Sequence, residues 1–186
     1  MGVTIAVILV NVSIVLLLLW TVITYNRLVR LRTQLRASWA QIDVQLKRRH
    51  SLIPNLVGTV RGYADHERAT FEAVTRARQA AEHPGDMASR AAAENALSGA
   101  LSRLIAVAEA YPQLAASASF RDLQAQLADT EDKIAYARQF HALAVQGYNG
   151  AVASVPTNLV AAVTGHREQP YFEAAGDERQ DVRVRF

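Results

Sequence analysis

Residues 3–24 are the most restrictive feature of this chain, because they form a long run without a charged side chain, VTIAVILVNVSIVLLLLWTVIT. At the rise of an α-helix this run spans about 33 Å, and the hydrocarbon core of a bilayer is roughly 30 Å thick. Trp20 and Tyr25 lie near its C-terminal end, as aromatic side chains at membrane interfaces do. The run therefore predicts one transmembrane helix over residues 1–25.

A cleaved secretory signal is the main alternative for this segment. The N-terminus lacks a basic region and no A-x-A cleavage site follows the run, so we expect an uncleaved, single-pass anchor. Basic residues follow the run closely and none precedes it. The positive-inside rule then places the N-terminus outside and residues 27–186 in the cytoplasm. The basic residues concerned are Arg27, Arg30, Arg32 and Arg36.

Charge is unevenly distributed along the rest of the chain. Residues 27–61 carry eight basic side chains and one acidic side chain, whereas residues 62–186 carry twelve basic and sixteen acidic ones. A basic excess beside the anchor favours contact with anionic lipid headgroups over nucleic-acid binding. The chain has no cysteine, which excludes disulfides, thiol catalysis and zinc–thiolate sites.

Helical periodicity continues beyond the anchor. Apolar side chains recur at gaps of three and four, and the segments HPGD, YPQL and Pro156 interrupt the pattern. The predicted helices are 26–50, 54–81, 87–110 and 119–152, with a further short helix at 157–164. The last long helix carries an unbroken heptad seam, typical of a coiled coil, made of Phe120, Leu123, Leu127, Thr130, Ile134, Ala137, His141 and Ala144.

Pro54 leaves two arrangements open. A proline inside a helix costs about 3 kcal/mol, whereas in a first turn it costs little. Ser51 could cap a helix that begins there, and the cations Lys47–Arg49 would stabilise the C-terminal end of the helix before it. The apolar phase nevertheless continues across the proline, from Leu46 to Val60, as it would in one continuous helix. These patterns favour the two arrangements about equally.

Several segments resemble the signature of the LemA family. Residues 25–67 contain YNRLVRLR, a tryptophan and IDVQLKRRHSLIPNLVGTVRGYADHE. ARQFHALAVQGYN at 137–149, VPTNLVAAVTG at 155–165 and YFE at 171–173 resemble it too. The resemblance covers nearly the whole chain. It implies a membrane-anchored, mostly helical bacterial protein with a four-helix bundle.

That implication favours a hairpin at residues 50–54. We therefore expect an all-α protein, in which a single transmembrane helix precedes an antiparallel, up-down-up-down four-helix bundle over residues 26–165. The tail over residues 166–186 contains glycine, proline and charge but little apolar periodicity, so we expect it to be mobile, with Tyr171 and Phe172 as the exception.

Motifs for catalysis or cofactor binding are missing from the sequence. No histidine has a glutamate three residues before it, as di-iron bundles require, and neither a phosphate-binding loop nor a G-x-S-x-G motif occurs. Asp65, His66 and Glu67 are adjacent, but adjacent positions point in different directions around a helix. The resemblance likewise implies no established activity and no catalytic residues. We expect a protein that is not an enzyme and binds no cofactor and no metal.

Two groups of residues are candidates for contact with partners. The first surrounds the basic cluster, whose ordinary role is to stabilise a helix end; its candidate docking residues are Lys47, Arg48, Arg49, Ile53, Pro54 and Leu56. The second contains a repeated Tyr-Asn pair, whose ordinary roles are packing and helix capping. In a hairpin bundle both pairs would lie near the membrane. This candidate membrane-proximal patch is made of Tyr25, Asn26, Arg27, Arg30, Tyr148 and Asn149.

These observations predict a membrane-anchored, non-enzymatic helical interaction module of the bacterial inner (cell) membrane. Its expected partners are the lipid bilayer and other membrane or cytoplasmic proteins, and not nucleic acid. The alternative is a structural homo-oligomer, a scaffold assembled on the membrane through exposed helix seams.

Overall fold

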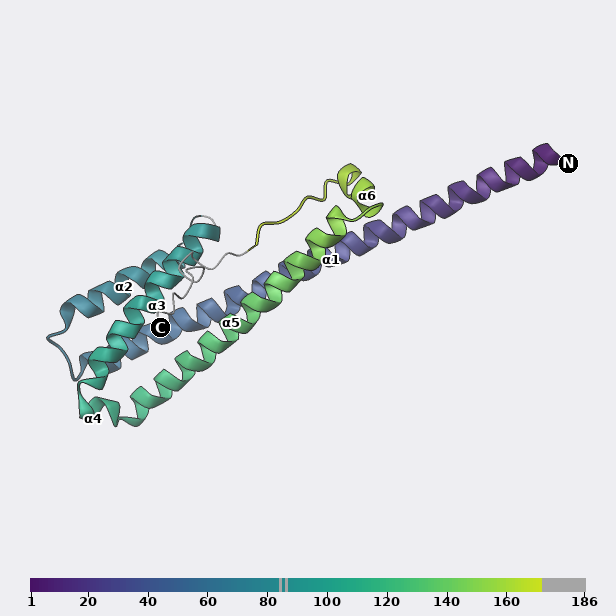
Figure 1. Cartoon of the computed structure of the whole chain (residues 1–186). Coiled ribbons are helices and arrows are strands. Elements are labelled where there is room, and N and C mark those ends of the chain that lie inside the picture. The colour runs from purple at the N-terminus through teal and green to yellow at the C-terminus, as the bar shows by residue number, and fades with distance from the viewer. Residues whose placement is uncertain (84, 86, 172–186) are drawn as a thin grey trace, which may run out of the picture. The chain divides into compact units, whose positions relative to one another are not determined.

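The computed structural model describes residues 1–83, 85 and 87–171, and within these ranges all regular secondary structure is helical (Figure 1). The all-α prediction is confirmed. The helices are α1 (Gly2–Arg61), α2 (Arg68–Glu82), α3 (Met87–Glu109), α4 (Pro112–Ala115), α5 (Ala118–Ala153) and α6 (Thr157–Val163). The described chain divides into two compact units. The first unit contains Met1–Ala40 and Gln139–Tyr171, and the second unit contains Gln41–Arg138.

Helix α1 runs through Pro54 without a break, so the predicted hairpin at residues 50–54 is wrong. Ile53, Leu56 and Val60, which flank or follow the proline, are buried in one apolar cluster. Burying several aliphatic side chains contributes more than the roughly 3 kcal/mol that an internal proline costs. Pro54 itself is exposed, and Ser51 does not cap a helix but donates its hydroxyl proton to the carbonyl of Arg48.

Replacing Pro54 with alanine should therefore stabilise the protein. The substitution restores a backbone donor in an exposed helical position, and the gain is reduced by the greater freedom of the unfolded chain. We expect the free energy of unfolding to rise by about 2 kcal/mol, measured by denaturant titration and circular dichroism in mild detergent. Ser51→Ala, an exposed change three residues earlier, is the control and should have little effect. A lower stability of Pro54→Ala would contradict a continuous α1.

The chain leaves α1 at Gly62, where the amides of Tyr63 and Ala64 both donate to the carbonyl of Val60. Helix α2 then begins at Arg68, which is fourteen residues later than the predicted start at residue 54. The predicted helix 26–50 is an inner part of α1, so neither of its ends is confirmed. The predicted helices 87–110, 119–152 and 157–164 agree with α3, α5 and α6 to within one residue at each end, because clear sequence breakers flank them.

The second unit encloses an apolar core to which α1, α2, α3, α4 and α5 all contribute. Phe71 and Val74 of α2 are buried in this core with Leu97 and Leu104 of α3, and α2 lies beside α3 (Figure 1). The Arg61 guanidinium lies 5.2 Å from the centre of the Phe71 ring, a distance at which a cation and an aromatic face attract. This core fixes the positions of the polar groups described below.

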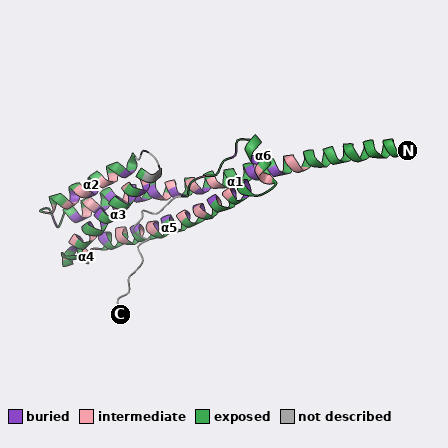
Figure 2. Ribbon diagram, turned by 45° about the horizontal axis from the view of Figure 1, so that its top comes forward, coloured by how far each residue is buried: buried purple, intermediate pink, exposed green. Residues whose placement is uncertain are grey.

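The first unit has a separate, smaller core. Leu28 of α1, Tyr148 of α5 and Val160 of α6 are buried there, with Trp20 partly buried against them. The predicted seam of α5 faces the interior, since each of its eight residues is buried or partly buried within its own unit. Most residues of α1 before Trp20 are exposed (Figure 2).

Candidate functional site

The N-terminal part of α1 has the properties of a membrane-spanning helix. It is long and apolar enough to cross a membrane, and none of its most apolar part is buried in the protein. Its polar side chains bond to backbone carbonyls one turn earlier. Asn11 Nδ2 donates to Val7, Ser13 Oγ to Leu9 and Thr21 Oγ1 to Leu17, over 2.8–2.9 Å. Such bonds satisfy polar groups where no water is present.

At the end of this span the structure brings two predicted patch residues to one histidine. The hydroxyl of Tyr148 lies 3.0 Å from Nδ1 of His166, and the Tyr25 and His166 rings meet edge to face at 6.2 Å. Burial, together with the Arg32 guanidinium, lowers the pKa of His166 below its ordinary value of 6.5. The imidazole is therefore neutral at pH 7, and it joins α1 to α5 within the first unit.

Asn149 makes a reciprocal pair of hydrogen bonds to the chain after α6. Its Nδ2 donates to the carbonyl of Gln169 and its Oδ1 accepts from the Gln169 amide, both at 2.8 Å. The remaining patch residues, Asn26, Arg27 and Arg30, are exposed. The patch is thus divided: both tyrosines and Asn149 hold the first unit together, and the other three face outward.

His166 and Gln169 belong to the segment 166–186 for which the sequence predicts mobility. His166 is buried, and the backbone of Gln169 is hydrogen-bonded to Asn149. The apolar pattern of the sequence predicts neither contact. Residues 172–186, the rest of this tail, lie outside the described residues, and what the sequence predicts for them stays a prediction.

A second histidine of the first unit, His141, is buried between α1 and α5. Its Nδ1 lies 2.9 Å from the Ser38 hydroxyl, which also donates to the carbonyl of Leu35 at 2.7 Å. The Trp39 ring lies 5.4 Å from the imidazole. Burial lowers the pKa of His141 below 6.5, and a backbone hydrogen bond with Leu35 partly offsets this effect. His141 is a core histidine in this structure.

These two lowered pKa values predict that the protein loses stability in weak acid. Below pH 6.5 an unfolded histidine takes up a proton that the folded state excludes. Stability should therefore be constant above pH 6.5 and should fall below it, down to the folded-state pKa, by up to about 1.4 kcal/mol per pH unit for each histidine.

The measurement is the free energy of unfolding between pH 8 and pH 5 for the natural chain and for His141→Gln. We expect a shallower pH dependence in His141→Gln, whereas Gln139→Ala, which removes no titratable group at an exposed position of the same helix, should keep the original slope. Equal slopes in all three proteins would refute the buried neutral state of His141.

The six predicted docking residues do not form one surface. Lys47, Arg48 and Pro54 are exposed, but Arg49, Ile53 and Leu56 are buried. Successive residues of a helix point about 100° apart, so the three consecutive cations lie on different faces of α1, and one of those faces is buried. Docking through Lys47, Arg48 and Pro54 stays a prediction, and the buried three belong to the core of the second unit.

Arg49 is the centre of a buried ionic cluster that the sequence does not reveal. Only 1% of its side chain is exposed, and the same holds for Glu94 of α3. Its Nη1 lies 2.6 Å from Oε1 of Glu131. Its Nη2 donates to the Ser98 hydroxyl at 2.9 Å and to the carbonyl of Glu94 at 3.2 Å. His50 Nε2 lies 2.8 Å from Oε1 of Glu94.

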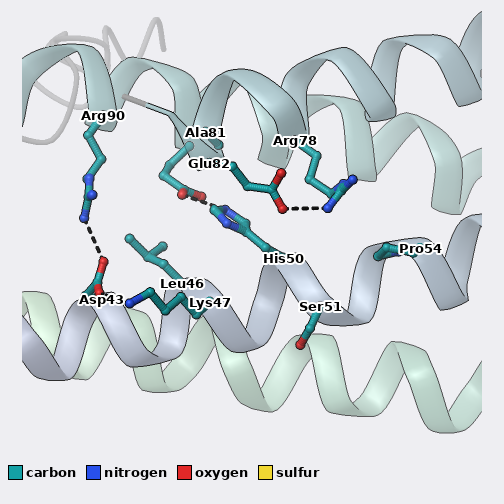
Figure 3. A pocket seen from close by; sticks show the side chains of 11 residues that line it. Asp43, Leu46, Lys47, His50, Ser51, Pro54, Arg78, Ala81, Glu82 and Arg90 are labelled. Atoms are coloured by element: carbon teal, nitrogen blue, oxygen red, sulfur yellow. Dashed lines mark hydrogen bonds and ion pairs between the residues drawn. The ribbon is translucent and has the colours of Figure 1, made fainter. Parts of the chain in front are cut away.

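The neighbouring surface of the second unit contains a cavity of about 590 Å³. His50 and Glu94 line it together with charged residues of α1, α2 and α3 (Figure 3). Arg90 reaches Asp43 at 3.0 Å, Lys47 reaches the same carboxylate at 2.8 Å, and Arg78 pairs with Glu82. Among the described residues, no three side chains of the metal-binding types gather in a way that could hold a metal ion.

Comparison with known proteins gives a family and three related proteins. The LemA family model matches residues 38–186. The magnetosome protein MamQ of Magnetospirillum gryphiswaldense is 25% identical to this chain over 193 aligned residues, which cover 89% of this chain and 71% of that protein. MamQ 1 and MamQ 2 of Paramagnetospirillum magneticum match with the same identity and coverage. Since the family model covers most of the chain, this protein belongs to the LemA family.

Proposed function

We propose that the protein is a membrane-anchored, non-enzymatic interaction module of the bacterial inner membrane. The observation that carries this proposal is the exposed apolar part of α1, whose polar side chains are satisfied within the helix. A surface of this kind is unfavourable in water and favourable in hydrocarbon. The part of the chain after the span would be held at the membrane surface, with the second unit folded as an up-down four-helix bundle.

The proposed orientation places residues 27–186 in the cytoplasm. Four arginines, Arg27, Arg30, Arg32 and Arg36, follow the span, and positive charge beside a span is retained on the cytoplasmic side. The test is a pair of reporters fused after Phe186. A reporter that is active only in the cytoplasm should be active, and one that is active only outside should be silent. The opposite result would overturn the orientation.

A non-enzymatic role is consistent with how the charges of the cavity are used. Arg78, Arg90 and Lys47 each contact a carboxylate, and His50 contacts Glu94. Mutual pairing of this kind positions helices and needs no ligand. Purified protein should therefore show the same unfolding temperature after exhaustive dialysis against a chelator, and a decrease would indicate a bound ion.

The proposed contact surface for a partner helix is a second heptad stripe on α5. Phe140, Leu143, Gly147 and Gly150 follow gaps of three, four and three, and all four are exposed. A Cβ atom added at either glycine meets nothing within 4 Å, so the backbone is open to close approach. This stripe, defined as the α5 outer seam, is separate from the inward seam and suits a helix of another protein.

The α5 outer seam also favours the second candidate function, a homo-oligomeric scaffold. A heptad stripe can pair with the same stripe of a second copy. The mass of the intact protein in native nanodiscs separates the candidates. A monomer supports docking of a different protein, and a defined oligomer that dissociates in Leu143→Glu supports the scaffold. Leu143→Ala, which keeps the seam uncharged, is the matched control.

A further inference from the structure

The end of α5 and the whole of α6 form a stretch of the chain without charge. Residues 150–165 read GAVASVPTNLVAAVTG, and the next charged side chain is Arg167. Two polar side chains in this stretch bond to backbone carbonyls nearby. Thr164 Oγ1 donates to the carbonyl of Val160 at 2.7 Å, and the Ser154 hydroxyl donates to the carbonyl of Gly150. The stretch therefore satisfies these groups without water.

The inner face of α6 lies beside the end of the predicted span. Val160 and Ala161 are buried with Leu28 and Tyr148, and Trp20 packs against the same cluster. Trp20 stands at the position where an aromatic side chain of a span lies at the membrane interface. A short helix that is buried in the same cluster as the neighbours of Trp20 is consequently expected at the depth of the lipid headgroups.

The outer face of this segment is aliphatic and fully accessible. Val155 is 80% exposed, Leu159 66% and Val163 89%, and they follow each other at intervals of four residues. Exposed aliphatic side chains are unfavourable in water, and this segment has no charged side chain that would favour its contact with water. The same side chains are favourable at the boundary between headgroups and acyl chains.

We propose that Val155, Leu159 and Val163 form a second membrane contact, a wedge that enters the lipid leaflet beside the anchor. The occupant of this face is lipid, because residues 150–165 carry no charge and the opposite face of α6 is buried in the cluster against which Trp20, at the end of the span, also packs. The exposed guanidinium groups of Arg27 and Arg30 lie on the next turns of α1 and suit anionic headgroups. The wedge would fix the tilt of the anchor in the bilayer. This inference rests on the proposed membrane anchoring.

The test uses nitroxide labels on the full chain, which has no cysteine of its own. Single variants Leu159→Cys and Val163→Cys are labelled and reconstituted into phosphatidylcholine–phosphatidylglycerol vesicles. Accessibility to oxygen, which concentrates in lipid, is compared with accessibility to a water-soluble nickel complex by electron paramagnetic resonance. A label at Ile14→Cys is the control for a position inside the bilayer. A label at Gln139→Cys, an exposed position of α5, is the control for a position in water.

We expect labels at 159 and 163 to favour oxygen over nickel and to lie about 5–10 Å below the headgroups, more shallowly than the label at 14. Labels at 159 and 163 that behave like the label at 139 would overturn the wedge while leaving the anchor intact. Protection from both reagents would also overturn it, because a second protein would then cover the face. Access of nickel to position 14 would overturn the anchor and the wedge together.

Discussion

Replacing Arg49 with leucine is expected to lower the free energy of unfolding by about 3–5 kcal/mol, the usual cost of removing one partner from a buried ion pair. The Arg49 guanidinium is 1% exposed and contacts Glu131, Ser98 and the backbone carbonyl of Glu94. Its removal leaves the carboxylate of Glu94 buried without the guanidinium group whose Nη2 lies 3.8 Å from Oε2, although His50 still contacts Oε1. Denaturant titration in mild detergent measures the loss.

The next residue along the chain supplies a matched control. Arg48 carries the same charge on the same helix, but its side chain is 42% exposed and lies 3.5 Å from the half-exposed Asp129. An exposed pair of this kind contributes little to stability, so Arg48→Leu should cost little. Equal losses in the two variants would contradict the assignment of the buried role to Arg49.

Introducing two arginines into the apolar part of α1 is expected to prevent stable membrane insertion. Leu16 and Leu17 are exposed to the surroundings of the protein, so the change disturbs no core contact. Each arginine at the centre of a spanning helix costs about 2.5–3.5 kcal/mol of insertion free energy. For Leu16→Arg with Leu17→Arg, most of the chain should leave the membrane fraction after an alkaline carbonate wash.

The control for this prediction keeps the apolar character of the span. Leu16→Ile with Leu17→Ile should remain in the membrane fraction to the same extent as the natural chain, because both side chains stay aliphatic. If the double arginine variant resists the carbonate wash as the control does, the anchoring role of this segment is wrong.

The sequence predicts helices well where apolar periodicity and local breakers agree. The bounds of α3, α5 and α6 follow from HPGD, YPQL and Pro156, which interrupt clear seams. The prediction of a helix break at Pro54 is wrong because the sequence shows only the local free-energy cost of a proline inside a helix. The buried contacts that outweigh this cost depend on the tertiary structure, and they are made by Ile53, Leu56 and Val60. The actual end of α1 at Arg61 carries only one weak signal, Gly62.

The candidate sites show the same limit. Tyr25 and Tyr148 could be predicted to lie near one another from the repeated Tyr-Asn pair, but the imidazole between them belongs to His166, in a segment without periodicity. The sequence alone does not show which of the three basic residues Lys47, Arg48 and Arg49 is buried. Only the facing residues, Glu94 and Glu131, distinguish the buried arginine from its exposed neighbours, and they lie 45 or more residues away in the sequence.

The most direct test of the account is the intact mass of the unaltered chain recovered from bacterial membranes after an alkaline carbonate wash. We predict that the protein stays in the membrane fraction, is released by detergent, and has the mass of a chain that retains the span at residues 1–25. A protein found in the carbonate supernatant, or a chain shortened by the loss of that span, would contradict a membrane-anchored module.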